Sequence, residues 1–227
     1  MLNAAPKPVA APRRANPLLV PQLARQLSQL GSGMGQLADE RSGSLGFGYL
    51  YYSLARLYQP QTVVCIGSYR GFAPVAFALA LAENGAGNCY FVDPGIVDRH
   101  WHNPAQIAQL NHRFGLGGRL RHLHRSSQQV IAEACLPEPI DLLYIDGDHS
   151  YAGVKFDFEQ FGALVRPGGL ILLHDSTAVG VGFTPWEVQA FLTAEVHGDP
   201  RYELLTLPLA AGLTIVRKCD EAHRRGA

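Results

Sequence analysis

Two carboxylates and an imidazole follow one another closely at the end of an apolar run. The run is IDLLYID, residues 140–146, and it leads directly into Asp146, Asp148 and His149. Burial penalises a charged side chain unless a metal, a ligand or a reacting group compensates the charge. Carboxylates beside an imidazole can hold a divalent cation or transfer a proton. We expect Asp148 to support the turn or the following helix rather than to coordinate directly.

A second pair of such side chains ends another apolar run, because His174 and Asp175 close GLILLHD at residues 169–175. If the two runs are neighbouring strands that end at one rim, Asp146 and Asp175 converge there. Two carboxylates brought close without a cation would repel, and the pKa of one would rise. A bound cation relieves this repulsion, so we expect Asp146 and Asp175, with His174, to surround one.

From residue 62 onward, apolar strands alternate with helical segments. Strands are expected at 62–67, 88–94, 119–124, 140–146 and 169–175, and helices at 72–84, 104–114, 127–134 and 151–165. This alternation predicts a parallel sheet covered on both faces. The last runs, RYELLTLP and GLTIVRK, are joined too closely for a parallel crossover. The predicted fold class is α/β: a Rossmann-like, doubly wound, mostly parallel sheet with an antiparallel C-terminal edge strand.

Ligands of such open sheets bind outside the carboxyl ends of the strands. Polar residues are concentrated at those ends, namely Gly67–Gly71, Asp93, Ser126–Gln128, Asp146–His149 and His174–Asp175. A dinucleotide site needs a second glycine in its GxGxxG turn for close approach of the pyrophosphate, whereas Tyr69 occupies that position here. Asp93 is placed to accept hydrogen bonds from two ribose hydroxyls. These features favour an adenosyl ligand over NAD.

Three segments resemble the class I S-adenosylmethionine-dependent methyltransferases: VVCIGSYRGFAPVAFA, CYFVDP and IDLLYIDGDHSYAGVKFDFEQFGALVRPGGLILLHDS. Within that class the chain looks most like the small bacterial O-methyltransferases with an IDGDHSY signature, which are distantly related to catechol O-methyltransferase. The resemblance extends from about residue 45 to residue 218. One departure is Cys65, which stands where the family commonly has an acidic residue that organises the loop around the methionine moiety.

The resemblance implies a set of site residues. Those implied to bind S-adenosylmethionine are Gly67, Ser68, Tyr69, Gly71, Asp93, Ser127, Gln128 and Asp146. The implied metal ligands are Asp146, His174 and Asp175. The candidate catalytic residues are Asp146, His149 and His174, the two histidines because imidazole titrates near the working pH. Many metal-dependent relatives have Asp-Asp or Asp-Asn at 174–175. The imidazole therefore weakens a magnesium assignment and suits manganese, iron or zinc better.

Methyl transfer from a sulfonium is an in-line displacement, so the enzyme mainly holds an oxygen nucleophile against the methyl group and ensures its deprotonation. A divalent metal can do both. Without one, His149 or His174 is the candidate general base. For His149 the alternative is a loop or helix-capping role before Ser150 and Tyr151.

Composition restricts the partners. The 19 basic and 19 acidic side chains cancel, so we expect a small-molecule hydroxyl acceptor rather than nucleic acid. No apolar stretch predicts a signal peptide or a membrane span, and scattered cysteines suit the reducing cytoplasm. Assembly is left open, with a homodimer as one option.

Three regions are expected along the chain. Residues 1–17 form a disordered leader, 18–60 a helical lid or substrate segment, and 61–227 the cofactor-binding domain. In the second region, Tyr49, Tyr51 and Tyr52 either cover the acceptor or pack the helix against the core. Trp101, with its neighbouring histidines, covers the adenine, binds substrate or belongs to an ordinary loop.

The sequence thus predicts an S-adenosylmethionine-dependent O-methyltransferase. Two alternatives stay open: a metal-dependent enzyme of the same fold with other chemistry, as in relatives of cephalosporin hydroxylase, and a non-catalytic protein that binds an adenosyl ligand, which Cys65 would suit.

Overall fold

The computed structural model describes residues 20–97, 99–177, 180–181 and 184–220. The expected leader, residues 1–17, lies outside the described residues. Among those described, no helix is long and apolar enough to cross a membrane.

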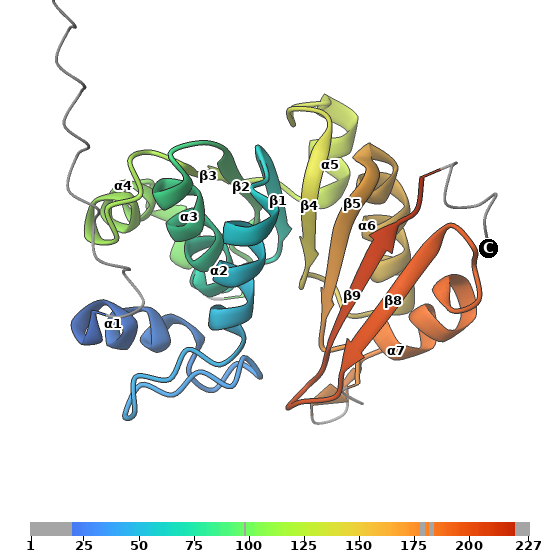
Figure 1. Cartoon of the computed structure of the whole chain (residues 1–227), viewed down its shortest axis with the longest axis horizontal. Coiled ribbons are helices and arrows are strands. Elements are labelled where there is room, and N and C mark those ends of the chain that lie inside the picture. Colours follow the sequence, from blue (N-terminus) through green and yellow to red (C-terminus); the bar gives the residue numbers. More distant parts are fainter. Residues whose placement is uncertain (1–19, 98, 178–179, 182–183, 221–227) are drawn as a thin grey trace, which may run out of the picture.

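A seven-stranded sheet in the order β3-β2-β1-β4-β5-β9-β8 forms the centre of the molecule (Figure 1). Its strands are β1 (Thr62–Ile66), β2 (Asn88–Val92), β3 (Leu120–Leu123), β4 (Ile140–Ile145), β5 (Val165–His174), β8 (Tyr202–Leu207) and β9 (Leu213–Lys218). The first five run parallel, while β9 pairs antiparallel with β5 and β8 antiparallel with β9. This confirms the predicted fold class, with β8 as the outermost strand.

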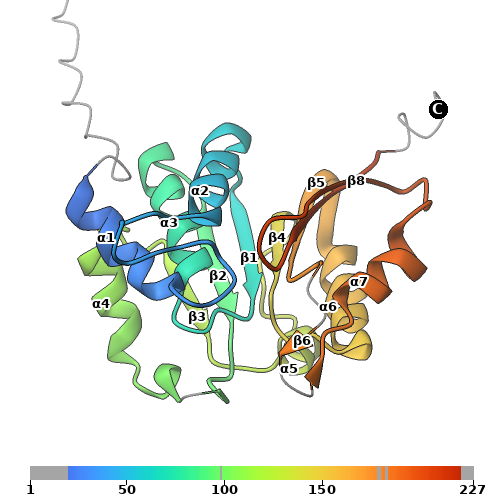
Figure 2. The same ribbon diagram turned by 90° about the horizontal axis from the view of Figure 1, so that it is seen from below.

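Helices cover both faces of this sheet (Figure 2). One face carries α1 (Pro21–Gly31), α2 (Phe47–Tyr58), α3 (Phe72–Asn84) and α4 (Ala105–Arg113); the other carries α5 (Ser127–Glu133), α6 (Tyr151–Leu164) and α7 (Val188–Phe191). Alternate residues of β1 serve the two layers, since Val63 and Cys65 join the first core and Val64 and Ile66 the second. All four are buried, as expected for a strand covered on both sides.

The segment before β1 shares the first core. Leu27 of α1 and Tyr51 of α2 are fully buried, and α1 packs so closely on α3 that a Cβ on Gly31 would lie 2.7 Å from the Phe72 ring. Residues 20–58 are therefore packed onto the rest of the fold. Their expected role as a lid stays a prediction.

Short elements connect the fifth strand to the C-terminal pair. β6 (Gly180–Val181) and β7 (Thr184–Pro185) form a small ribbon, and a π-helical turn, Leu192–Val196, follows α7. Glu187 anchors this connection, because its backbone N–H donates to the His149 carbonyl at 2.8 Å and its carboxylate accepts from the Tyr151 N–H at 2.9 Å. The connection is thereby held against the start of α6.

Candidate functional site

The strand order reverses between β1 and β4, and the ends of these two strands meet in direct contact. The Asp146 N–H donates to the Ile66 carbonyl at 2.8 Å. Gly67 has φ +74°, and a Cβ there would lie 2.1 Å from the Asp146 carbonyl oxygen. Glycine at this position is therefore required by the approach of the two strand ends, a reason that the sequence pattern did not reveal. Gly67 joins the turn after β1 to the acidic end of β4.

The turn after β1 holds the carboxylate that ends β2. Ser68 donates twice to Asp93 Oδ2, from its N–H at 3.1 Å and from its hydroxyl at 2.9 Å. Gly95 N–H donates to Asp93 Oδ1 at 2.8 Å. Tyr69 adopts φ +49°, and Gly71, with φ +93°, begins α3. A carboxylate accepts about four hydrogen bonds, so with the partners found among the described residues this one retains an open acceptor position on Oδ1.

Cys65 lies inside the first core. Its side chain is fully buried, and its sulfur is 3.8 Å from that of Cys89. Burial raises the pKa of the Cys65 thiol well above its ordinary value, so this position carries no negative charge. The structure thus offers no anion where the family commonly has one.

Ser127 and Gln128 open α5 at the carboxyl end of β3. Ser126 caps this helix in a reciprocal pair with Gln129. Burial raises the pKa of Asp157 of α6 to about 7 and outweighs the effect of the Ser127 side chain, which lies near Asp157 and lowers its pKa. Gln128 is exposed. Sequence reasoning missed Asp157, because its position inside a helix gives no indication that it faces Ser127.

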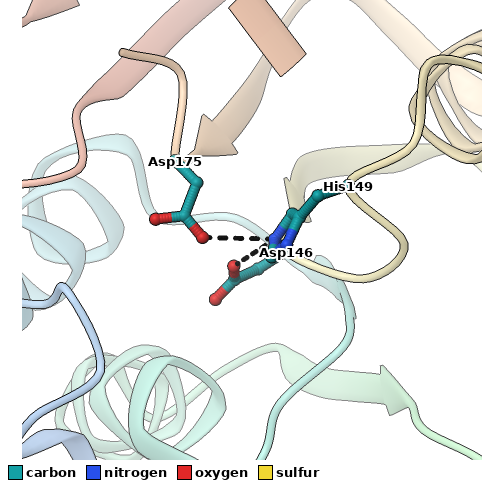
Figure 3. Close-up of side chains that lie close together, drawn as sticks. All are labelled: Asp146, His149 and Asp175. Carbon is teal, nitrogen blue, oxygen red and sulfur yellow. Dashed lines mark hydrogen bonds and ion pairs between the residues drawn. The ribbon is translucent and has the colours of Figure 1, made fainter. Parts of the chain in front are cut away.

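Asp146, His149 and Asp175 converge at the ends of β4 and β5 (Figure 3). The His149 Nε2 atom lies 3.4 Å from Asp146 Oδ1 and 3.2 Å from Asp175 Oδ2. One donor atom from each residue lies within 4.8 Å of the other two. Burial would lower the pKa of His149, but the hydrogen bond to Asp146 and the charges of both carboxylates raise it. The arrangement can hold a cation or move a proton.

His174 lies behind this cluster. Its side chain is 1 % exposed, and its Nδ1 atom is 3.3 Å from Asp146 Oδ1 and 3.1 Å from Asp175 Oδ1. Burial alone would lower its pKa, but the two carboxylates outweigh burial and raise the pKa of His174 to about 10. Among the described residues, neither ring nitrogen finds a well-directed hydrogen-bond partner, and neither does Asp175 Oδ1. Asp146, His149 and Asp175 form a group of converging donors that could hold a cation, and the assignment of His174 as a metal ligand stays a prediction.

Further side chains complete the site, and sequence reasoning did not assign them to it. Trp186 packs on His149 with ring centroids 4.7 Å apart. Tyr144 donates to Asp146 Oδ2 at 2.9 Å, and Gln36 contacts the same oxygen. The two-residue repeat of a strand could have indicated Tyr144, which shares a face of β4 with Asp146. Asp148 accepts from the Ser150 N–H at 3.0 Å, so it supports the turn as expected.

A doubly wound sheet with its polar residues gathered at the switch point defines a nucleotide-type ligand-binding fold. Residues 64–176 match the family model described as a methyltransferase domain. The chain belongs to the class I S-adenosylmethionine-dependent methyltransferases. The narrower IDGDHSY group stays a prediction.

Solved structures share the fold. An O-methyltransferase from Bacillus cereus in complex with SAH is similar with a TM-score of 0.65 at 19% identity, covering 86% of this chain and 90% of that one. The O-methyltransferase TomG from Streptomyces achromogenes, involved in tomaymycin synthesis and in complex with SAM, has a TM-score of 0.64 at 17% identity, covering 87% and 89%.

A curated relative, the uncharacterized protein y4gI from Sinorhizobium fredii, is 29% identical over 165 residues, or 69% of this chain. The match spans only 18% of that relative's length. A second, uncharacterized protein R132 from Acanthamoeba polyphaga mimivirus, is matched over 51% of its length.

Proposed function

We propose that this chain transfers the methyl group of S-adenosylmethionine to a hydroxyl oxygen of a small molecule. We further propose that Asp146, His149 and Asp175 hold a divalent cation where that oxygen binds. One observation carries the proposal: the donors of these residues converge within 4.8 Å at the rim that also holds the Gly67 turn and Asp93. The rim thus has an adenosyl half, the Gly67 turn with Asp93, and an acidic half, Asp146 with His149 and Asp175. The acceptor oxygen would meet the methyl group between these two halves.

The residues of the first half fit an adenosyl cofactor. Asp93 stands at the end of β2 with its carboxylate fixed by Ser68 and Gly95, and its open position can accept from a ribose hydroxyl. A second ribose hydroxyl would replace the Ser68 hydroxyl on Oδ2. The neutral Cys65 thiol leaves the methionine end to be bound by the turn itself.

The residues of the second half fit a divalent cation. Asp175 is 6 % exposed, and its Oδ1 has no hydrogen-bond partner among the described residues, although burial penalises an unsatisfied carboxylate oxygen. Two carboxylates and an imidazole suit manganese, iron or zinc better than magnesium. When bound, such a cation would lower the pKa of the acceptor hydroxyl and orient its oxygen.

The side chains themselves divide the remaining work. The new bond to the methyl carbon forms as the carbon–sulfur bond of the sulfonium breaks, so the hydroxyl proton must leave the acceptor. When His149 holds the cation through Nε2, that proton would leave to solvent; without a cation, His149, whose side chain is 21 % exposed, would receive it. Trp186 packs on the ring of His149 and restricts its rotation.

The experiment separates these roles. Protein stripped with a chelator and then desalted is titrated with S-adenosylhomocysteine and assayed for methyl transfer to a panel of catechols, phenols and sugars, with and without Mn²⁺ or Mg²⁺. We expect S-adenosylhomocysteine binding without metal, and transfer only after a cation is restored.

Full activity after removal of metal by the chelator would refute the proposed cation site and leave His149 as the general base. If S-adenosylhomocysteine binds but no acceptor is methylated with either ion, the result would favour one of the two alternatives: a non-catalytic protein that binds an adenosyl ligand, or an enzyme of the same fold with other chemistry.

A further inference from the structure

The loop between α1 and α2 reaches the end of β4 through one buried amide. Gln36 is 5 % exposed. Its Nε2 donates to the Tyr144 hydroxyl at 3.1 Å and to Asp146 Oδ2 at 3.3 Å. Its Oε1 accepts from the Tyr51 hydroxyl at 2.8 Å. A residue 110 positions before Asp146 thus contacts a carboxylate at the centre of the proposed cation site.

The backbone around Gln36 is held tightly. Phe47 N–H donates to the Gln36 carbonyl at 2.9 Å. Gly46 has φ +48°, and a Cβ there would lie 2.2 Å from the same carbonyl oxygen. A Cβ on Gly35 would lie 3.4 Å from His174 Cε1. The loop therefore lies directly against His174 and leaves the Gln36 side chain little freedom to turn elsewhere.

The partners of the amide determine which way it faces. Asp146 Oδ2 requires a donor, because a carboxylate oxygen only accepts, whereas the Tyr51 hydroxyl can donate to the amide oxygen. A flipped amide would place its oxygen, which also only accepts, against Asp146 Oδ2. The chain of donors thus runs from Tyr51 to Gln36, and from Gln36 and Tyr144 to Asp146 Oδ2.

The two oxygens of Asp146 consequently have different surroundings. Oδ2 accepts from Tyr144 at 2.9 Å and from Gln36 at 3.3 Å. Oδ1 faces the imidazoles of His149 at 3.4 Å and His174 at 3.3 Å. Rotation of the carboxylate would break both hydrogen bonds to Oδ2, so Oδ1 stays directed into the cluster.

We propose that Gln36 is a positioning residue: together with Tyr144 it fixes Oδ2 of Asp146, directs Oδ1 to the cation, and makes the loop before α2 part of the cation site. This inference rests on the proposed cation. Outer partners of metal ligands typically change metal affinity by 10- to 100-fold when removed.

The test measures Mn²⁺ affinity by calorimetry rather than activity alone. Gln36→Leu and Tyr144→Phe are each expected to weaken Mn²⁺ binding about tenfold or more, with S-adenosylhomocysteine affinity unchanged. The double variant should lose less than the product of the two single effects, because both groups bond to one oxygen. Gln29→Leu, which alters an exposed glutamine of α1, is the matched control.

The outcomes are distinguishable. Wild-type protein that binds no Mn²⁺ overturns the proposed cation site itself. Wild-type protein that binds Mn²⁺ while both single variants bind it equally well overturns only the positioning role, and a lowered melting temperature alone would then mark Gln36 as a packing residue. If Gln36→Leu fails to fold, Gln36→Met, which better keeps the length of the side chain, and Tyr144→Phe, which removes a single oxygen, decide the question.

Discussion

The two halves of the rim are built differently. In the adenosyl half, the turn after β1 binds Asp93 through Ser68, 25 positions away, and much of the bonding uses backbone N–H groups. In the acidic half, Asp146 gathers side chains from Gln36, His149 and His174, which lie on three separate segments. The first half depends on local chain geometry, and the second on the packing of the whole fold.

The largest effect is expected from a substitution that disrupts the acidic half and leaves the adenosyl half intact. Asp146→Asn removes the charge that His149 and His174 face, so we expect Mn²⁺ binding and methyl transfer to fall by more than about 100-fold while S-adenosylhomocysteine still binds. Calorimetry and a transfer assay measure both. Asp148→Asn alters a neighbouring carboxylate that only supports the turn and should retain both functions. Loss of S-adenosylhomocysteine binding in Asp146→Asn would show that the halves are not independent.

A second change tests the contact that joins the halves. Gly67→Ala places a Cβ 2.1 Å from the Asp146 carbonyl oxygen, whereas a Cβ on Gly85, at the same φ of +74°, meets nothing within 4 Å. Gly85→Ala should cost about 1 kcal/mol from backbone strain, and Gly67→Ala about 3 kcal/mol because of the added clash. Denaturant unfolding measures both. Equal losses would mean that the strand ends separate without difficulty.

A third change concerns the support of the adenosyl half. The pKa of Asp157 is about 7 in the fold, above its ordinary value of 3.8, so the folded state binds the proton more tightly. The contribution of Asp157 to the free energy of unfolding is therefore fully present at low pH and is lost as the pH rises through 7. Between pH 5 and pH 7 the loss is about 2 kcal/mol. Denaturant unfolding of Asp157→Asn should show a flatter pH profile than the wild type, and parallel profiles would refute the role.

The smallest change sharpens the comparison within the adenosyl half. Asp93→Ala removes charge-assisted hydrogen bonds and should weaken S-adenosylmethionine binding about tenfold or more while leaving Mn²⁺ affinity intact. Ser68→Ala removes one bond to the same carboxylate and frees a position on Oδ2, so it should weaken binding less. Isothermal titration distinguishes the two. An unchanged dissociation constant in folded Asp93→Ala would remove Asp93 from the site.

The difference between the halves also explains what could be predicted from the sequence. The parallel strands, the antiparallel C-terminal pair and the polar strand ends were predictable, because apolar runs and turn residues are local patterns. Asp93 and the Gly67 turn share that local character. Gln36 could not be found, since a glutamine in a glycine-rich loop gives no indication of its burial. Asp157 was missed because a single acid in a helix does not reveal which neighbour it faces. His149 and His174 could be named, but the position of His149 between both carboxylates depends on the bend of the chain after β4.

The position of Gln36 affects how the chain can be shortened. The family model covers residues 64–176, and a fragment cut to those limits would keep the turn, Asp93, both histidines and both converging carboxylates. It would lack the amide that contacts Asp146 Oδ2 and the Tyr51 hydroxyl that orients that amide. Such a fragment would contain every motif residue of the site and yet hold Oδ2 of Asp146 through Tyr144 alone. The smallest unit that retains the acidic half as described therefore begins ahead of Gln36, well before the first strand.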